Sequence, residues 1–113
     1  MTAVFVQDGN SIDYTPSTDV AAGDVVVQGD LVGVAKLDIS ANTLGALAVT
    51  GVFDFPKAEG SGEGISAGAT IFWNPTQQEA SEEESAGDGT VLLGKATKDA
   101  ADDDATVRVR MTQ

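Results

Sequence analysis

Short apolar runs separated by glycine, aspartate and asparagine follow one another along the chain. They are densest between Ala22 and Phe55, where three valine-rich runs are each too short to form a buried helix. Runs of this length and composition, bounded by turn residues, are typical of β-strands. In chain order, the predicted strands cover residues 12–15, 25–27, 31–35, 45–55, 69–74, 91–96 and 106–111.

Two of these segments alternate in a way that predicts their place in a sheet. Residues 45–55 carry apolar or small side chains on both faces, which predicts a central strand with a bulge or bend at Gly51. Residues 106–111 place Val107, Val109 and Met111 on one face, and Arg108 and Arg110 on the other. This last strand is therefore predicted to cover a core with one face only.

Two segments lack any such pattern. Residues 57–64 contain three glycines, and their composition predicts a flexible loop. Residues 76–89 contain five acids, no base and no large apolar side chain, which predicts a solvated loop.

The two halves of the chain match each other. Residues 22–27 correspond to 67–72 with an offset of 45, and residues 31–38 correspond to 92–99 with an offset of 61. A third match pairs residues 46–49 with 105–108, and the acidic 76–89 segment accounts for the increase in offset. The pattern predicts an all-β fold: a small β-barrel or sandwich of two similar three-strand units, with a short N-terminal strand or hairpin.

The N-terminal part has two interpretations. An apolar run at 3–6, a turn at 7–10 and a strand at 12–15 form either a hairpin or an arm whose first strand pairs outside the domain. We expect an N-terminal arm or hairpin over residues 1–15 and a single β-barrel domain over residues 16–113.

Composition excludes several classes of function. The chain has no cysteine and no histidine, so thiol catalysis, disulfides and the commonest general base and metal ligand are excluded. The net charge of −12 argues against binding to nucleic acid or to an anionic membrane. It fits either a very soluble protein at high local copy number or a salt-adapted host. The N-terminus does not resemble a signal peptide and no apolar run approaches membrane-spanning length, so we expect synthesis in a host cytoplasm.

Few residues are candidates for a site. The clusters Glu82–Glu84 and Asp102–Asp104 lack the spacing of a calcium loop, so we expect a solvated surface and no metal or cofactor. Arg108 and Arg110 belong either to an exposed sheet face or to a contact with a neighbouring subunit or a capsid. Trp73, the only tryptophan, is either a core residue or an interface anchor.

Several blocks, in order, resemble the DUF2190 family of small phage proteins described as capsid cement or decoration proteins. These blocks are FVQDGNSIDYT at 5–15, AGDVVV at 22–27, LVGVAKLDI at 31–39, GALAVTGVFDFPKA at 45–58, AGATIFW at 67–73 and ATVRVR at 105–110. The acidic 76–89 segment departs from the expected pattern, because it is longer and more charged.

The resemblance implies a non-enzymatic structural protein on the outer surface of a phage head, as a homotrimer that contacts the major capsid protein. A β-domain that binds across capsid joints would stabilise the shell by mass action. We expect the contact to a capsid or subunit to involve residues of the N-terminal arm and three others. These are Thr2, Ala3, Val4, Phe5, Val6, Trp73, Arg108 and Arg110.

Two other functions compete with this expectation. The first is a β-barrel ligand-binding or adhesion module on a virion surface, which an exposed Trp73 beside a cleft would favour. The second is a hydrolase, which the absence of histidine and cysteine disfavours.

Overall fold

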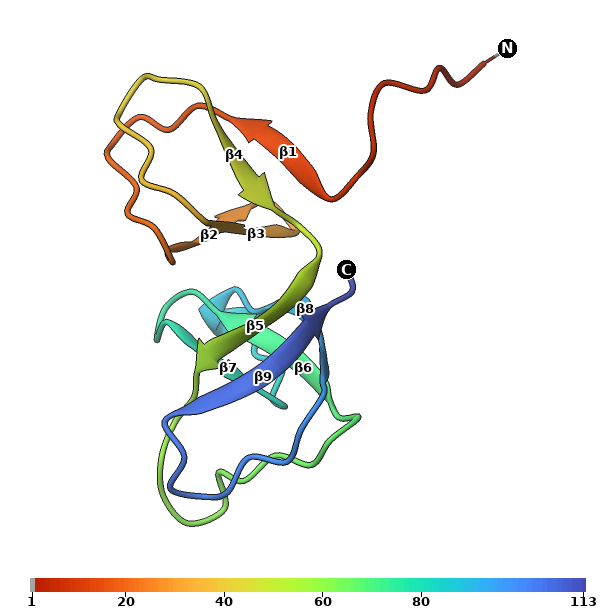
Figure 1. Cartoon of the computed structure of the whole chain (residues 1–113). Helices are drawn as coiled ribbons and strands as arrows, with labels where there is room; N and C mark the ends of the chain where they lie inside the picture. The colour runs from red at the N-terminus through yellow and green to blue at the C-terminus, as the bar shows by residue number, and fades with distance from the viewer. Residues whose placement is uncertain (1) are drawn as a thin grey trace. The chain divides into compact units, whose positions relative to one another are not determined.

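Nine β-strands and one short 3-10 turn form the protein, as the computed structural model of residues 2–113 shows (Figure 1). Two compact units divide the chain: the first comprises the residues up to Val26 and Gly33–Thr50, and the second comprises Val27–Val32 and Gly51–Gln113. The elements are β1 (Ser11–Tyr14), β2 (Val25–Gln28), β3 (Leu31–Ala35), β4 (Gly45–Ala48), β5 (Gly51–Pro56), β6 (Thr70–Asn74), β7 (Glu79–Ser81), η1 (Ala86–Asp88), β8 (Val91–Ala96) and β9 (Thr106–Met111). The prediction of an all-β fold is confirmed. Within residues 2–113 no helix is long and apolar enough to cross a membrane.

The first sheet is four-stranded, in the order β1-β4-β3-β2, and β4 pairs antiparallel with both of its neighbours. Its core forms where β3 and β4 meet the segment that follows β3, because Ala35, Ile39 and Leu47 are buried against one another. Ile12 and Tyr14 of β1 pack against this cluster. The predicted β3 is confirmed, and residues 32–35 are buried on both faces, as a run of valine and alanine favours.

The second sheet is five-stranded and antiparallel, in the order β5-β9-β8-β6-β7. Its first and last strands, β5 and β7, also contact each other, so the sheet curls around its own core. The largest fully buried side chains inside it are those of Phe55, Ile71, Trp73, Leu93 and Met111. On β9, Val107, Val109 and Met111 are buried while Arg108 and Arg110 are exposed, which confirms the predicted alternation.

Equivalent hydrogen bonds in the two units confirm the internal repeat. Each unit has a glycine in the left-handed region, Gly23 (φ 93°) and Gly68 (φ 89°), which the turn before β2 or β6 requires. A β-bridge joins Val20 to Ile39 in the first unit, and Ile65 to Ala100 in the second. The Gly23 N–H donates to Ala35 O at 2.6 Å, as the Gly68 N–H donates to Ala96 O at 2.7 Å. The Ala22 N–H donates to Asp38 Oδ1, as the Ala67 N–H donates to Asp99 Oδ1, both at 2.8 Å. Equivalent residues that precede β3 and β8 differ by 45 in number, and equivalent residues from β3 and β8 onward differ by 61, as the sequence offsets predicted.

The structure corrects the third sequence match. Leu47 of β4 pairs with Ala35, and Val109 of β9 pairs with Ala96. Leu47 is therefore equivalent to Val109, and the prediction that residues 46–49 match 105–108 is wrong by three residues. The loops before β4 and β9 differ in length, so a match based on a short pattern that begins with alanine aligned these two strands in the wrong register.

The repeat also extends to a fourth strand that the sequence comparison missed. β1 pairs with β4 as β5 pairs with β9, so Ile12 and Asp13 correspond to Phe53 and Asp54. The order β1-β4-β3-β2 thus matches β5-β9-β8-β6, and β7 has no counterpart in the first sheet. The repeated units contain four strands each, one more than predicted.

The predicted central strand over residues 45–55 is wrong. The segment forms two strands, β4 in the first sheet and β5 at the edge of the second, with a break at Val49 and Thr50. Gly51 follows the break with φ 124°, a conformation that L side chains rarely adopt. The predicted bend at Gly51 is confirmed. Because the apolar alternation continues across the bend, the sequence pattern does not show that the chain passes from one sheet to the other there.

The predicted solvated loop over residues 76–89 contains secondary structure. β7 pairs with β6, Ala80 opposite Trp73, and Ala80 is 1% exposed. Asn74 forms the turn between them, because its Oδ1 accepts the backbone N–H groups of Thr76 and Gln77, each at 3.0 Å. The interpretation as a wholly solvated loop is therefore wrong. A polar strand of three residues is too short to show the apolar alternation from which strands are predicted.

Candidate functional site

The N-terminal segment exposes the most prominent apolar side chains of the protein. Residues 2–10 are exposed and residues 2–8 lie outside every strand. Val4, Phe5 and Val6 are 74%, 79% and 84% exposed. Three consecutive apolar side chains in water are unfavourable, at about 25 cal/mol for each Å² of apolar surface, which is the pattern of a segment that binds a partner.

Trp73 lies in the core of the second unit. It is 1% exposed, and its ring centroid is 5.9 Å from that of Phe55. Its indole Nε1 is buried without a hydrogen-bond partner among residues 2–113. A contact through Trp73 would require this core to open, so its side chain is not part of the surface that the folded unit presents.

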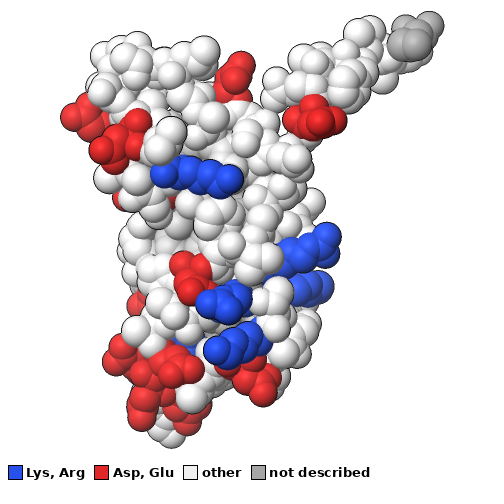
Figure 2. All heavy atoms as spheres, viewed as in Figure 1, with Lys and Arg blue, Asp and Glu red and all other residues white. Residues whose placement is uncertain are grey.

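Arg108 and Arg110 project from the exposed face of β9 and have different surroundings. Arg108 forms a two-pronged contact with Asp54 of β5, with Nε to Oδ1 at 3.0 Å and Nη2 to Oδ2 at 3.3 Å. Arg110 lies opposite Val52 of β5 and Lys95 of β8. Most of the basic surface visible in Figure 2 lies together over the region of β9.

The Arg108–Asp54 pair predicts a small pH dependence. The hydrogen bond from Arg108 lowers the pKa of the Asp54 carboxyl, which is half-exposed. A carboxyl whose pKa is lower in the folded than in the unfolded chain stabilises above the unfolded pKa, and this contribution is lost as the pH falls through the folded value. Asp54→Asn is therefore expected to reduce the loss of stability between about pH 5 and about pH 2, measured by urea unfolding.

The control for this effect is Asp13→Asn at the equivalent position of β1, where the opposite residue is Ala46 rather than an arginine. Asp13 is exposed, and its replacement breaks no arginine pair, so this variant isolates the effect of removing a carboxylate from an exposed strand position. Parallel stability curves for wild type and Asp54→Asn would contradict the prediction.

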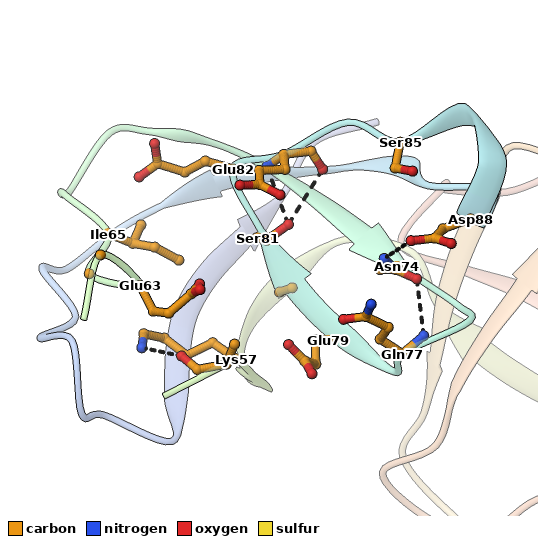
Figure 3. A pocket seen from close by; sticks show the side chains of 15 residues that line it. Lys57, Glu63, Ile65, Asn74, Gln77, Glu79, Ser81, Glu82, Ser85 and Asp88 are labelled. Atoms are coloured by element: carbon orange, nitrogen blue, oxygen red, sulfur yellow. Dashed lines mark hydrogen bonds between the residues drawn. The ribbon is translucent and has the colours of Figure 1, made fainter. Parts of the chain in front are cut away.

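A polar pocket of about 350 Å³ lies in the second unit, beside β7 (Figure 3). Its lining includes five carboxylates, but no three acids among the described residues are arranged to hold a metal ion. The carboxylates are those of Glu63, Glu79, Glu82, Glu83 and Asp88.

Other polar groups of the pocket are used to hold the chain itself. Asn74 donates to Asp88 Oδ2 at 3.0 Å and accepts from the turn, and the Lys57 ammonium donates to backbone carbonyls (Figure 3). Asn74 and Lys57 are therefore already paired within the chain.

The structure adds residues that sequence reasoning did not single out. Lys95, Val52 and Leu92 share the exposed sheet face with Arg110, and Lys57 is 5% exposed. A count of bases on the predicted strands would have drawn attention to Lys95. No sequence signal marks Lys57, because its partners are main-chain carbonyls.

The comparison with known proteins gives one family. The sequence profile of the family described as phage cement protein matches residues 6–111. The searches of curated proteins and of solved structures gave no match. The match spans nearly the whole chain, including both repeated units, and agrees with the family expected from the sequence. The chain therefore belongs to the phage cement protein family.

Proposed function

We propose that this protein decorates the outer surface of a phage head as a homotrimer, binds the major capsid protein and stabilises the shell without catalysis. Membership of the cement protein family carries the proposal, because it associates the chain with the phage capsid as a structural protein. The geometry supports it through the exposed apolar segment at Val4–Val6, which has no partner strand within residues 2–113. The expected location is the virion, after synthesis in the host cytoplasm.

Residues 2–6 of the N-terminal arm supply the contact in this proposal. An extended segment can add a strand to an exposed sheet edge of a partner, where backbone hydrogen bonds give affinity and side-chain pockets give specificity. Burial of a valine or phenylalanine side chain is worth about 1.5–3 kcal/mol, partly offset by the ordering of each residue at about 1–2 kcal/mol. The net gain for each arm is therefore on the order of a few kcal/mol, and bound protein stabilises the shell by mass action.

Deletion of residues 2–6 is expected to lower the occupancy of undecorated heads by about tenfold or more at equal protein concentration, since the apolar contact is lost. The measurement is co-sedimentation with heads of the phage that encodes the protein. The thermal midpoint should stay close to that of wild type, because residues 2–6 are exposed and pair with no strand.

A control separates side chains from chain length. Replacing Val4, Phe5 and Val6 by serine keeps the backbone and should weaken binding as the deletion does. Full occupancy with the deletion variant would overturn the role of the arm, and failure of wild type to bind heads would overturn the proposed function.

The adhesion alternative has no observation in its favour. It called for an exposed Trp73 beside a cleft, and Trp73 is 1% exposed.

A further inference from the structure

One face of the second sheet is basic although the protein is strongly acidic. The chain has 18 acids and 6 bases. The neighbouring strands β5, β9 and β8 instead contain three bases, Lys95, Arg108 and Arg110, and a single acid, Asp54. All four side chains are exposed, so they lie on the outer face of the sheet. The local charge therefore has the opposite sign to that of the whole chain.

Two of these bases face each other without a carboxylate between them. Lys95 of β8 lies directly opposite Arg110 of β9, and like charges at such positions destabilise a sheet. The one ion pair within residues 2–113 joins Arg108 to Asp54, so the single acid of these strands is already engaged. Lys95 donates at 2.6 Å to the Thr70 hydroxyl, which leaves its charge uncompensated.

Apolar side chains lie beside the two uncompensated bases. Val52 of β5 is directly opposite Arg110 and is 54% exposed, and Leu92 precedes Lys95 on β8 and is 40% exposed. Together, Val52, Leu92, Lys95 and Arg110 form what we call the basic face. Arginine next to exposed apolar side chains is the composition of a protein interface rather than of an ordinary solvated sheet.

We propose that the basic face binds a carboxylate-bearing, partly apolar patch on the capsid protein. This inference rests on the proposed function and names the chemistry of its partner. A protein is favoured over nucleic acid because the net charge of −12 repels a polyanion at long range and because half-exposed Val52 and Leu92 offer nothing to a phosphate backbone. Attraction between the basic face and carboxylates of the capsid protein would also orient the protein on the shell, since those carboxylates repel its acidic surfaces.

Charge reversal on this face tests the inference. The variant with both Lys95→Glu and Arg110→Glu is expected to lower head occupancy by about tenfold or more in low salt. The wild-type interaction should weaken as salt is raised from about 0.05 to about 0.5 M, since screening shortens the reach of these charges. The measurement is co-sedimentation over a range of protein concentrations, together with the thermal midpoint of each variant.

Matched controls exclude a general charge effect. Lys36→Glu changes the charge of an exposed base outside this sheet by the same amount as Arg110→Glu, and only the latter should weaken binding. Should the double glutamate variant fail to fold, the variant with both Lys95→Gln and Arg110→Gln removes the charges without adding acids. This variant is expected to bind heads more weakly, and its binding is expected to depend less on salt.

Three outcomes would overturn the inference while leaving the proposed function intact. The first is full occupancy by the folded charge-reversal variant. The second is loss of self-association by that variant in light scattering, which would make the face a contact between copies of this chain. The third is binding of wild type, but not of the variant, to a single-stranded oligonucleotide. Failure of wild type to bind heads would instead overturn the proposed function.

Discussion

Gly94→Ala is expected to destabilise the second unit more than any other single methyl addition that the structure suggests. A Cβ atom at this position would overlap the carbonyl oxygen of Arg110 and would lie 2.9 Å from the backbone nitrogen of Thr112. These are main-chain atoms of the β9 segment, so no side-chain rotation can relieve the overlap. The two segments must separate, which disturbs a central pairing of the sheet, and we expect a loss of about 3 kcal/mol or more.

The measurement is the thermal midpoint, which should fall by on the order of 10 °C or more. Gly87→Ala is the matched control: it adds the same methyl group in the same unit, and no atom lies within 4 Å of its new Cβ. That variant should have the same thermal midpoint as the wild type. A Gly94→Ala midpoint within about 2 °C of wild type would show that β8 and β9 do not approach as closely as the structure has them.

Lys57→Met is expected to cost about 2–4 kcal/mol, the second largest effect. Lys57 is 5% exposed, and its ammonium donates to the backbone carbonyls of Ala58 at 2.7 Å, Asp104 at 2.9 Å and Asp102 at 3.3 Å. Methionine has similar length but no donor, so three carbonyls lose a charged partner. The ammonium thus holds the loop that follows β5 to the loop that precedes β9.

Urea unfolding measures the loss, and limited proteolysis locates it, with faster cleavage expected in residues 58–64 and 101–105. Lys36→Met is the control, because Lys36 is exposed and its removal should change the unfolding midpoint little. Equal midpoints for Lys57→Met and wild type would mean that the three carbonyls find water or other donors without cost.

The buried position of Lys57 also explains how an acidic cluster can be structural. Asp102 and Asp104 contribute carbonyls to the ammonium, while their carboxylates accept backbone N–H groups of Gly64 and Ala101, each at 2.8 Å. The cluster interpreted from the sequence as solvated surface is indeed exposed. Its side chains nevertheless form turns, which is a common use of aspartate.

Local patterns in the sequence were sufficient for the class of fold and for much of the repeat. Valine-rich runs between glycine and aspartate predicted strands because backbone preference and side-chain alternation act over a few neighbouring residues. The same locality explains why the alternation of residues 106–111 was enough to place Arg108 and Arg110 on an exposed face. Matching turns at Gly23 and Gly68 recur because the same left-handed conformation is needed twice.

The all-β class, the duplication, the apolar run near the N-terminus and the family could be predicted from the sequence, since each depends on residue order alone. Strand pairing in three dimensions was needed to show that residues 45–55 divide between two sheets and that β7 forms beside β6. It was also needed to show that Trp73 is buried and that Lys95 faces Arg110. These features depend on which strands pair and in what register, and pairing joins residues far apart in the chain. A short polar strand or a like-charged pair therefore has no local signature, and its position follows from the packing of the whole sheet.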